Sequence, residues 1–160
     1  MTKSKKLKKE RLMMVLATFS LLLADQITKI LAINLLDEPV KLIGNFLTLE
    51  KTFNPGIAFG IGVHPRLILI FSILLIVLVL KVAKEEMNFE NVFSKWAISL
   101  ILAGAFGNVI DRINKGEVLD FISFNFWPAF NLADIFIVAG VILVIVKYKS
   151  ILKNSPKRSS

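Results

Sequence analysis

The sequence predicts an all-α integral membrane protein with four transmembrane helices, a small extracytoplasmic β-hairpin-like cradle and a surface loop or helix. Apolar residues make up 55% of the 160 residues, and the mean hydropathy is +0.69, far above that of soluble domains. Four segments are apolar over a length suited to crossing a bilayer. They leave no connection large enough for a second core, so residues 1–160 are predicted to form one polytopic domain.

The predicted spans are residues 12–36, 66–83, 94–113 and 131–146, of which the last is short. The basic start of the first span resembles a cleavable signal peptide. Hydrophobicity resumes after Asp25 and Gln26, however, which makes the run long enough to cross the membrane. The polar residues 153–160 are predicted to be a disordered cytoplasmic tail.

The distribution of Lys and Arg predicts the orientation, because positively charged loops resist translocation. The N-terminal tail carries six, residues 81–95 carry three, and the segment from Lys147 carries five, which places fourteen on one side. Both termini are therefore predicted to be cytoplasmic. The basic tails are short, flank apolar spans and lack interleaved aromatic residues, so no nucleic-acid partner is expected.

The two outward connections differ from ordinary loops. Residues 40–63 contain the β-prone run 45–49, a turn signal at 54–56 and two further glycines, which predicts a short twisted hairpin. Residues 114–130 carry four Phe and one Trp, and such rings favour the headgroup zone of a bilayer. Both connections are therefore expected on the outer membrane surface.

Elimination narrows the chemistry. Cysteine is absent, so thiol nucleophiles and thiolate metal sites are excluded. The only histidine is His64, next to Pro65 in a connection, which excludes a zinc site with two histidines on one helix and disfavours a serine–histidine pair. We expect no metal and no cofactor. Carboxylate chemistry remains.

Three carboxylates, Asp111, Asp120 and Asp134, are brought to one depth by this topology. Two neighbouring carboxylates share a proton, so the ionised one can activate water while the neutral one hydrogen-bonds a scissile carbonyl. Simpler interpretations stay open: Asp134 could cap a helix three residues after Asn131, Asp120 could be a solvated loop residue, and Asp111 beside Arg112 could be structural.

Two further features lie within the spans. Asp25 and Lys29 share a helix face, either as a polar contact between helices or with Lys29 reaching a lipid phosphate. Ser99, Ala103 and Gly107 form a stripe of small residues, interpreted as a packing surface between helices.

Five sequence blocks now carry a family resemblance: residues 25–29 (DQITK), 54–59 (NPGIAF), 104–112 (GAFGNVIDR), 118–121 (VLDF) and 130–134 (FNLAD). In this order, over nearly the whole chain, they resemble the signature blocks of bacterial lipoprotein signal peptidase, or signal peptidase II. Pro55 is a local variation. The resemblance implies that Asp120 and Asp134 are the catalytic pair. It also implies a set of site-lining or supporting residues, in which we include Gly104 and Asp111: Asp25, Lys29, Asn54, Gly104, Asn108, Asp111, Arg112 and Asn131.

The same resemblance implies an aspartic endopeptidase in the bacterial cytoplasmic membrane, active near its outer face. Such enzymes remove the signal peptide from a diacylglyceryl prolipoprotein just before the lipidated cysteine. Membrane phospholipids are expected contacts, and a monomer is expected. The alternatives are a small carrier or proton-relay subunit and a purely structural membrane partner. The carrier hypothesis requires a polar path across the bilayer, yet the inner halves of the later spans are nearly unbroken apolar sequence.

Overall fold

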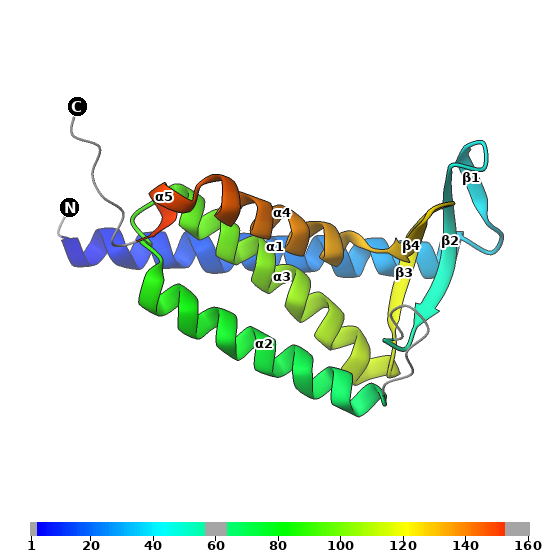
Figure 1. Cartoon of the computed structure of the whole chain (residues 1–160), viewed down its shortest axis with the longest axis horizontal. Coiled ribbons are helices and arrows are strands. Elements are labelled where there is room, and N and C mark those ends of the chain that lie inside the picture. The colour runs from blue at the N-terminus through cyan, green and yellow to red at the C-terminus, as the bar shows by residue number, and fades with distance from the viewer. Residues whose placement is uncertain (1–2, 57–63, 153–160) are drawn as a thin grey trace.

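A helical bundle with a small sheet at one end makes up the fold (Figure 1). The structure is a computed structural model that describes residues 3–56 and 64–152. Its elements, in chain order, are α1 (Lys3–Leu35), β1 (Val40–Ile43), β2 (Leu47–Asn54), α2 (Pro65–Glu86), α3 (Val92–Lys115), β3 (Val118–Phe124), β4 (Trp127–Phe130), α4 (Leu132–Val146) and α5 (Tyr148–Ile151).

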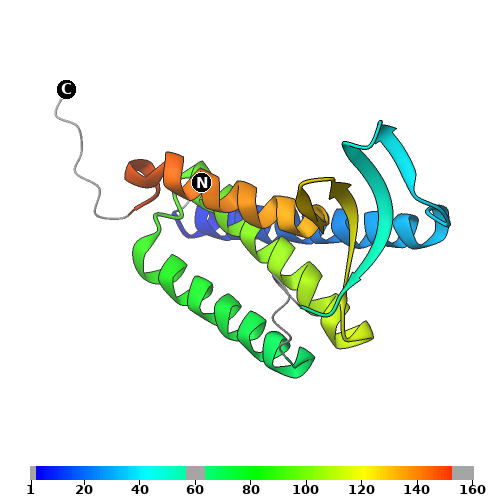
Figure 2. The same ribbon diagram turned by 45° about the vertical axis from the view of Figure 1, so that its right-hand side comes forward.

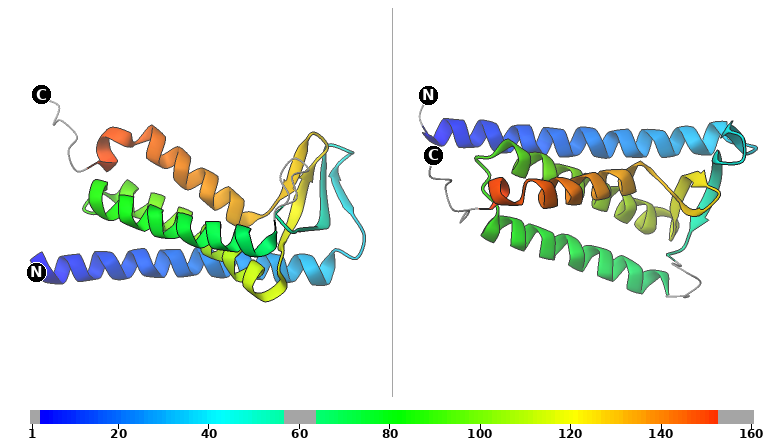
Figure 3. Two further views of the ribbon diagram at one scale, coloured as in Figure 1. Left: turned by 60° about the horizontal axis from the view of Figure 1, so that its bottom comes forward. Right: turned by 45° about the horizontal axis from the view of Figure 1, so that its top comes forward.

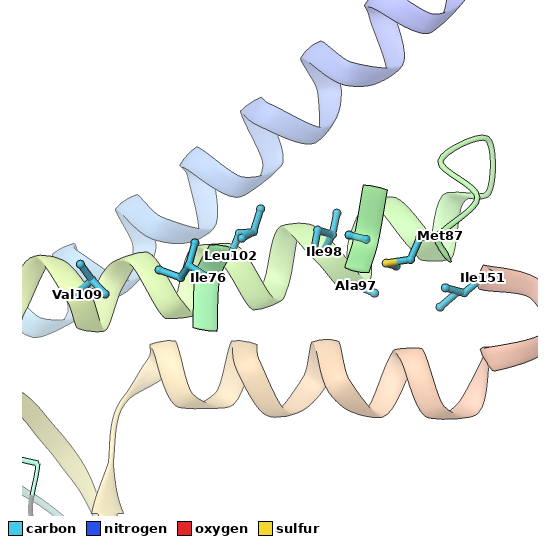
Figure 4. Close-up of a cluster of buried hydrophobic side chains, with 8 residues drawn as sticks. Ile76, Met87, Ala97, Ile98, Leu102, Val109 and Ile151 are labelled. Atoms are coloured by element: carbon cyan, nitrogen blue, oxygen red, sulfur yellow. The ribbon is translucent and has the colours of Figure 1, made fainter. Parts of the chain in front are cut away.

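Helix α3 is the centre of the bundle and contacts α1, α2 and α4 (Figures 1 and 3). Small residues allow this close packing: a Cβ atom on Gly140 of α4 would lie 2.9 Å from the Ala97 carbonyl oxygen of α3. A cluster of apolar side chains along α3 packs toward α2 and α5, and we call it the apolar cluster (Figure 4). It consists of Ile76, Ala83, Met87, Ala97, Ile98, Leu102, Val109 and Ile151.

Short local signals set where the helices begin and end. His64 caps α2 by accepting a hydrogen bond from the Arg66 amide on Nδ1, with Pro65 at the first helical position. Asn91 caps α3, which ends at Gly116 with a φ of 78°. His64 therefore has a capping role here, consistent with its exclusion from catalysis.

Both outer connections contribute to one antiparallel sheet of order β1-β2-β3-β4 (Figure 2). Strands β1 and β2 confirm that this connection contains a hairpin, but its turn is wrong in the prediction: it lies at residues 44–46, within the predicted β-prone run, whereas the turn signal at 54–56 lies at the end of β2. The prediction of an all-α protein with a surface loop or helix is wrong for residues 118–130, which form β3 and β4. These residues are rich in aromatic and β-branched side chains, which favour strands, and the two strands pair across a turn at Asn125 and Phe126.

The protein is a multi-pass membrane protein by the length and apolarity of its helices. Three of them, within Lys8–Leu35, Pro65–Glu86 and Val92–Lys115, are long and apolar enough to span. Helix α4 has 15 residues, about 22 Å at 1.5 Å per residue against about 30 Å of hydrocarbon. The count of four spans stays a prediction, and the predicted tail 153–160 lies outside the described residues.

Candidate functional site

The predicted site residues meet where the sheet joins the bundle. Six of the eight buried polar or charged residues in the described ranges lie at this junction, and we call them the polar cluster. They are Asp25, Lys29, Asn108, Asp111, Asp120 and Asn131, contributed by α1, α3, β3 and the start of α4. The other two, Ser94 and Ser99, lie nearer the start of α3.

Asp120 lies in the buried first half of β3, and its side chain receives two amide donors. Asn54 Nδ2, at the end of β2, donates to Oδ2 at 3.0 Å, and Asn131 Nδ2 donates to Oδ1 at 2.7 Å. The pKa of Asp120 is raised to about 6: burial is the main cause and the charge of Asp134 adds to it, while the hydrogen bonds from Asn54 and Asn131 and the charge of Lys29 lower the pKa. Asp120 is thus a carboxyl group that holds a proton well above the ordinary range of an aspartate.

Asp134 has two roles at the start of α4. Its Oδ2 accepts from the Asn131 backbone amide at 3.1 Å, while Asn131 Oδ1 accepts from the Asp134 amide at 3.1 Å, which completes a capping box. The capping interpretation left open by the sequence is therefore confirmed. Its other oxygen, Oδ1, accepts from Asn108 Nδ2 at 2.8 Å, so the cap fixes the carboxylate without occupying all of it.

Two asparagines connect the carboxyl groups. Asn131 Nδ2 donates to Asp120 and also to Asn108 Oδ1 at 3.2 Å, and Asn108 in turn donates to Asp134. Each amide has a defined orientation, because the oxygen of Asn131 is held by the α4 backbone and that of Asn108 by Lys29 Nζ at 3.2 Å. The NH₂ groups are consequently directed at the carboxylates.

Lys29 is buried between two carboxylates. Its Nζ lies 2.9 Å from Asp25 Oδ2 and 2.8 Å from Asp111 Oδ2, and the residue is 2% exposed. The hypothesis that Lys29 reaches a lipid phosphate is therefore wrong, and the polar contact between helices is correct. Asp111 is accounted for by this ion pair, which agrees with the structural role that the sequence allowed.

Asp25 connects α1 to the start of α4, because its Oδ1 accepts from the Ala133 amide at 2.9 Å. Gln26 was missed as a site-supporting residue, although it is next to Asp25 in the first sequence block. Its Nε2 lies 3.0 Å from Asp25 Oδ2 and 3.4 Å from both the Gly107 carbonyl oxygen and Asp111 Oδ1. Its position next to Asp25, which with Lys29 forms a charged pair inside a span, could have indicated this role from the sequence.

Two glycines of α3 let these groups approach. A Cβ atom on Gly104 would collide with the Ala133 carbonyl oxygen, and one on Gly107 would collide with Asp25 Oδ2. Gly104 thus supports the site by permitting contact between helices. Gly107 confirms the small-residue stripe as a packing surface, where Ser99 also donates to the Met14 carbonyl oxygen at 3.2 Å.

Arg112 and Asn54 lie at the margin of the polar cluster. Arg112 Nη1 donates to the Asn108 carbonyl oxygen at 3.4 Å, and its buried Nε has no hydrogen-bond partner among the described residues. Asn54 Oδ1 accepts from the Gly56 amide at 2.8 Å, in a turn where Gly56 has a φ of 95°. This turn includes Pro55 and directs the Asn54 amide at Asp120, whereas the rest of its block, residues 57–59, lies outside the described residues.

An apolar cavity of about 440 Å³ ends at Asp134. Apart from that carboxylate, its lining is apolar: Trp127, Phe130, Ile135, Val138, Ala139 and Ile142. No group of three or more metal-ligating side chains is found within residues 3–56 and 64–152. The arrangement therefore offers two carboxyl groups, linked through asparagine side chains, of which Asp134 also lines an apolar groove.

Comparisons with known proteins agree with one another. The sequence profile described as signal peptidase (SPase) II matches residues 17–149. The lipoprotein signal peptidase of Caldicellulosiruptor bescii is 41% identical over 133 residues, with 81% of this chain and 84% of that protein covered. The lipoprotein signal peptidase of Staphylococcus haemolyticus is 39% identical over 140 residues, with 82% and 87% covered.

A solved structure of a bacterial membrane enzyme has a similar fold. Its TM-score is 0.76 at 31% sequence identity, and the match covers 92% of this chain and 93% of that one. A second solved bacterial membrane enzyme gives a TM-score of 0.72 at 32% identity over 85% and 92% of the two chains. Sequence and fold therefore point to the same group of proteins.

Proposed function

Because the chain belongs to the signal peptidase II family, it is a peptidase that removes signal peptides from prolipoproteins, and we propose that it does so with Asp120 and Asp134 as an aspartic pair. The observation that carries this assignment is the amide network that joins the two carboxyl groups at the end of an apolar cavity. The expected substrate is a diacylglyceryl prolipoprotein, cleaved before its lipidated cysteine.

The two carboxyl groups take different roles in this mechanism. Asp120, whose pKa is raised to about 6 by burial, holds the proton, and Asp134, which lines the cavity, is ionised. Asp134 takes a proton from water as the water oxygen attacks the scissile carbonyl carbon, and Asp120 gives its proton to the carbonyl oxygen. As the C–N bond breaks, Asp134 passes its proton to the leaving amine, and Asp120 recovers one from a hydroxyl of the tetrahedral intermediate.

The neighbouring residues orient this pair. Asn54, Asn108 and Asn131 hold the carboxyl groups, and Arg112 lies beside them, donating to the Asn108 carbonyl oxygen. The apolar cavity beside Asp134 fits a lipid chain or the apolar part of a signal peptide. The polar cluster at one end of the bundle favours this mechanism over a carrier, which would need polar groups along the whole path.

The membrane placement is also part of the proposal. We infer four spans in the bacterial cytoplasmic membrane, cytoplasmic termini, a monomer and a site near the outer face. Eleven Lys and Arg of the described residues support this placement, because they belong to the start of α1, the region where α2 is followed by α3, and the segment after α4, which lie opposite the sheet. A reporter fused after Ser160 should then report cytoplasm, and one inserted beside Lys115 should report the outside. The reverse labelling would overturn both the orientation and the depth of the site.

Cleavage of a lipidated prolipoprotein by purified protein tests the aspartic pair. Asp120→Asn and Asp134→Asn should each lower kcat/KM by about 100- to 10,000-fold while the protein stays folded, because Asn cannot exchange the proton. The double variant should be scarcely worse, since the pair acts as one unit. Asp111→Asn is the matched control, and it should lower stability more than cleavage. Inhibition by EDTA, or an active Asp134→Asn, would contradict the mechanism.

A further inference from the structure

A second cavity of about 440 Å³ lies at the end of the bundle remote from the sheet. The start of α1, the last turn of α2, the following connection and the first turns of α3 surround it. Its lining consists of Glu10, Arg11, Met14, Val15, Lys84, Phe89 and Lys95, none of which belongs to the site described above. Its volume is within the range of about 300 to 1,000 Å³ that is usual for ligand sites.

The lining is both basic and apolar. Three cations and one carboxylate give it a net charge of +2, while Met14, Val15 and Phe89 supply apolar surface. The carboxylate of Glu10 lies 3.8 Å from Lys95 Nζ, and both side chains are largely buried, at 16% and 17% exposure. A long ion pair of this kind leaves the cavity electropositive, which suits an amphipathic anion.

A smaller, mostly apolar cavity lies next to the first one. It has a volume of about 190 Å³, shares Met14 and Lys95 with the first cavity, and is lined along α1 and α3 also by Ala17, Trp96 and Ser99. The Ser99 hydroxyl already donates to the Met14 carbonyl oxygen, so the smaller cavity can accept an apolar ligand group without leaving this hydroxyl unpaired. The half-exposed Trp96 flanks it, as aromatic residues do at membrane interfaces.

We propose that these neighbouring cavities bind one anionic phospholipid, with its phosphate between Arg11 and Lys95 and one acyl chain in the smaller cavity beside α1 and α3. This inference rests on the proposed orientation, which puts this end at the cytoplasmic leaflet, where anionic lipids create a negative surface potential. Basic pockets between transmembrane helices on that side bind anionic headgroups. The smaller, mostly apolar cavity distinguishes a lipid from an acidic peptide or a free phosphate.

Lipid binding to the purified full chain in detergent tests this assignment. Phosphatidylglycerol should stay bound in native mass spectra and raise Tm, whereas phosphatidylcholine with the same acyl chains should do so much less. Arg11→Gln combined with Lys95→Gln should weaken phosphatidylglycerol binding about 30-fold, from about fivefold for each cation. Arg11→Gln alone keeps the Glu10–Lys95 pair, so it should fold normally and show about the fivefold loss.

Two controls separate this site from general attraction to anionic lipid. Lys81→Gln combined with Lys149→Gln removes two exposed charges from the same end but outside the cavity lining, and should leave binding unchanged. Ala17→Phe fills the smaller cavity and should abolish retention while all charges remain. Three results would overturn the proposal: the same loss of phosphatidylglycerol binding in both double variants, full binding by Ala17→Phe, or an equal rise in Tm with inorganic phosphate. Cleavage in detergent should be unchanged in the Arg11 and Lys95 variants, so failure here is distinct from failure of the aspartic mechanism.

Discussion

The apolar cluster and the polar cluster are held together by different forces. In the apolar cluster, side chains such as Ile98 and Leu102 pack around small residues with no directional contact. In the polar cluster and at its margin, Lys29 and the asparagines Asn54, Asn108 and Asn131 are fixed by hydrogen bonds and ion pairs between 2.7 and 3.2 Å. Packing fixes the distance between helices, whereas the polar network also fixes which way each amide and carboxylate is turned. Catalysis by a proton-sharing pair requires that second kind of control.

The largest effect on stability is expected from Lys29→Met. The substitution leaves Asp25 and Asp111 buried without their shared cation, which typically costs about 3–5 kcal/mol of unfolding free energy. Thermal unfolding in detergent, followed with cleavage of lipidated substrate, measures both consequences. Adding Asp111→Asn to Lys29→Met should recover part of the stability, because one uncompensated charge is removed. A stable, fully active Lys29→Met would show that the polar cluster is not the structural base of the site.

In the apolar cluster, Ile98→Ala should lower the free energy of unfolding by about 2 kcal/mol and leave cleavage per folded molecule unchanged. Ile98 is 2% exposed within the apolar cluster, so its truncation leaves a cavity. The cost should lie near the lower end of the range for core truncations, because lipid tails are as apolar as the side chain that is lost. An activity loss larger than the loss of folded protein would mean that packing in the apolar cluster also affects the polar cluster.

The sequence was sufficient to predict the elements that depend on local pattern. Apolar length located the helices, and the carboxylates could be brought to one depth because consecutive spans run in opposite directions. The joining of both outer connections into one sheet was not predictable, since it depends on pairing of β2 with β3 across more than 60 residues, as Asn54 and Val118 do. The roles of Gln26 and of the asparagine amides were hidden for the same reason. Most of their partners lie on other helices or on β3, and an amide gives no sign in sequence of which way it will turn.

The stability and the activity of the protein should both depend on pH through Asp120. Because the pKa of Asp120 is raised to about 6 from 3.8, folding favours its protonated form. The contribution of Asp120 to stability should therefore be fully present below about pH 4 and be lost as pH rises through about 6. The basic limb of kcat/KM should begin in the same region as the proton is lost. Asp120→Asn should remove this fall in stability.

Asn54→Ala sharpens the same test. The Asn54 amide stabilises the charged form of Asp120, so its removal should raise the pKa of Asp120 and move both the fall in stability and the basic limb to higher pH. Denaturation midpoints and kcat/KM, measured in parallel from pH 4 to pH 9, give the two curves. A shift to lower pH would reverse the assigned role of this hydrogen bond.

The smallest effect is expected for an ion pair outside both clusters. Lys51 Nζ lies 3.4 Å from Asp37 Oδ1, but the Asp37 side chain is 90% exposed, whereas the partners of Lys29 are buried. Exposed pairs contribute about 0 to 1 kcal/mol, because water screens the charges and the side chains lose freedom when they pair.

Asp37→Asn should therefore change stability by less than about 1 kcal/mol, and Lys51 keeps its contact to the Ile33 carbonyl oxygen at 3.3 Å. Unfolding at low and high salt provides the measurement, since any small contribution should vanish in salt. A loss approaching that of Lys29→Met would show that attachment of β2 to the end of α1, rather than burial of charge, controls the stability of the sheet end.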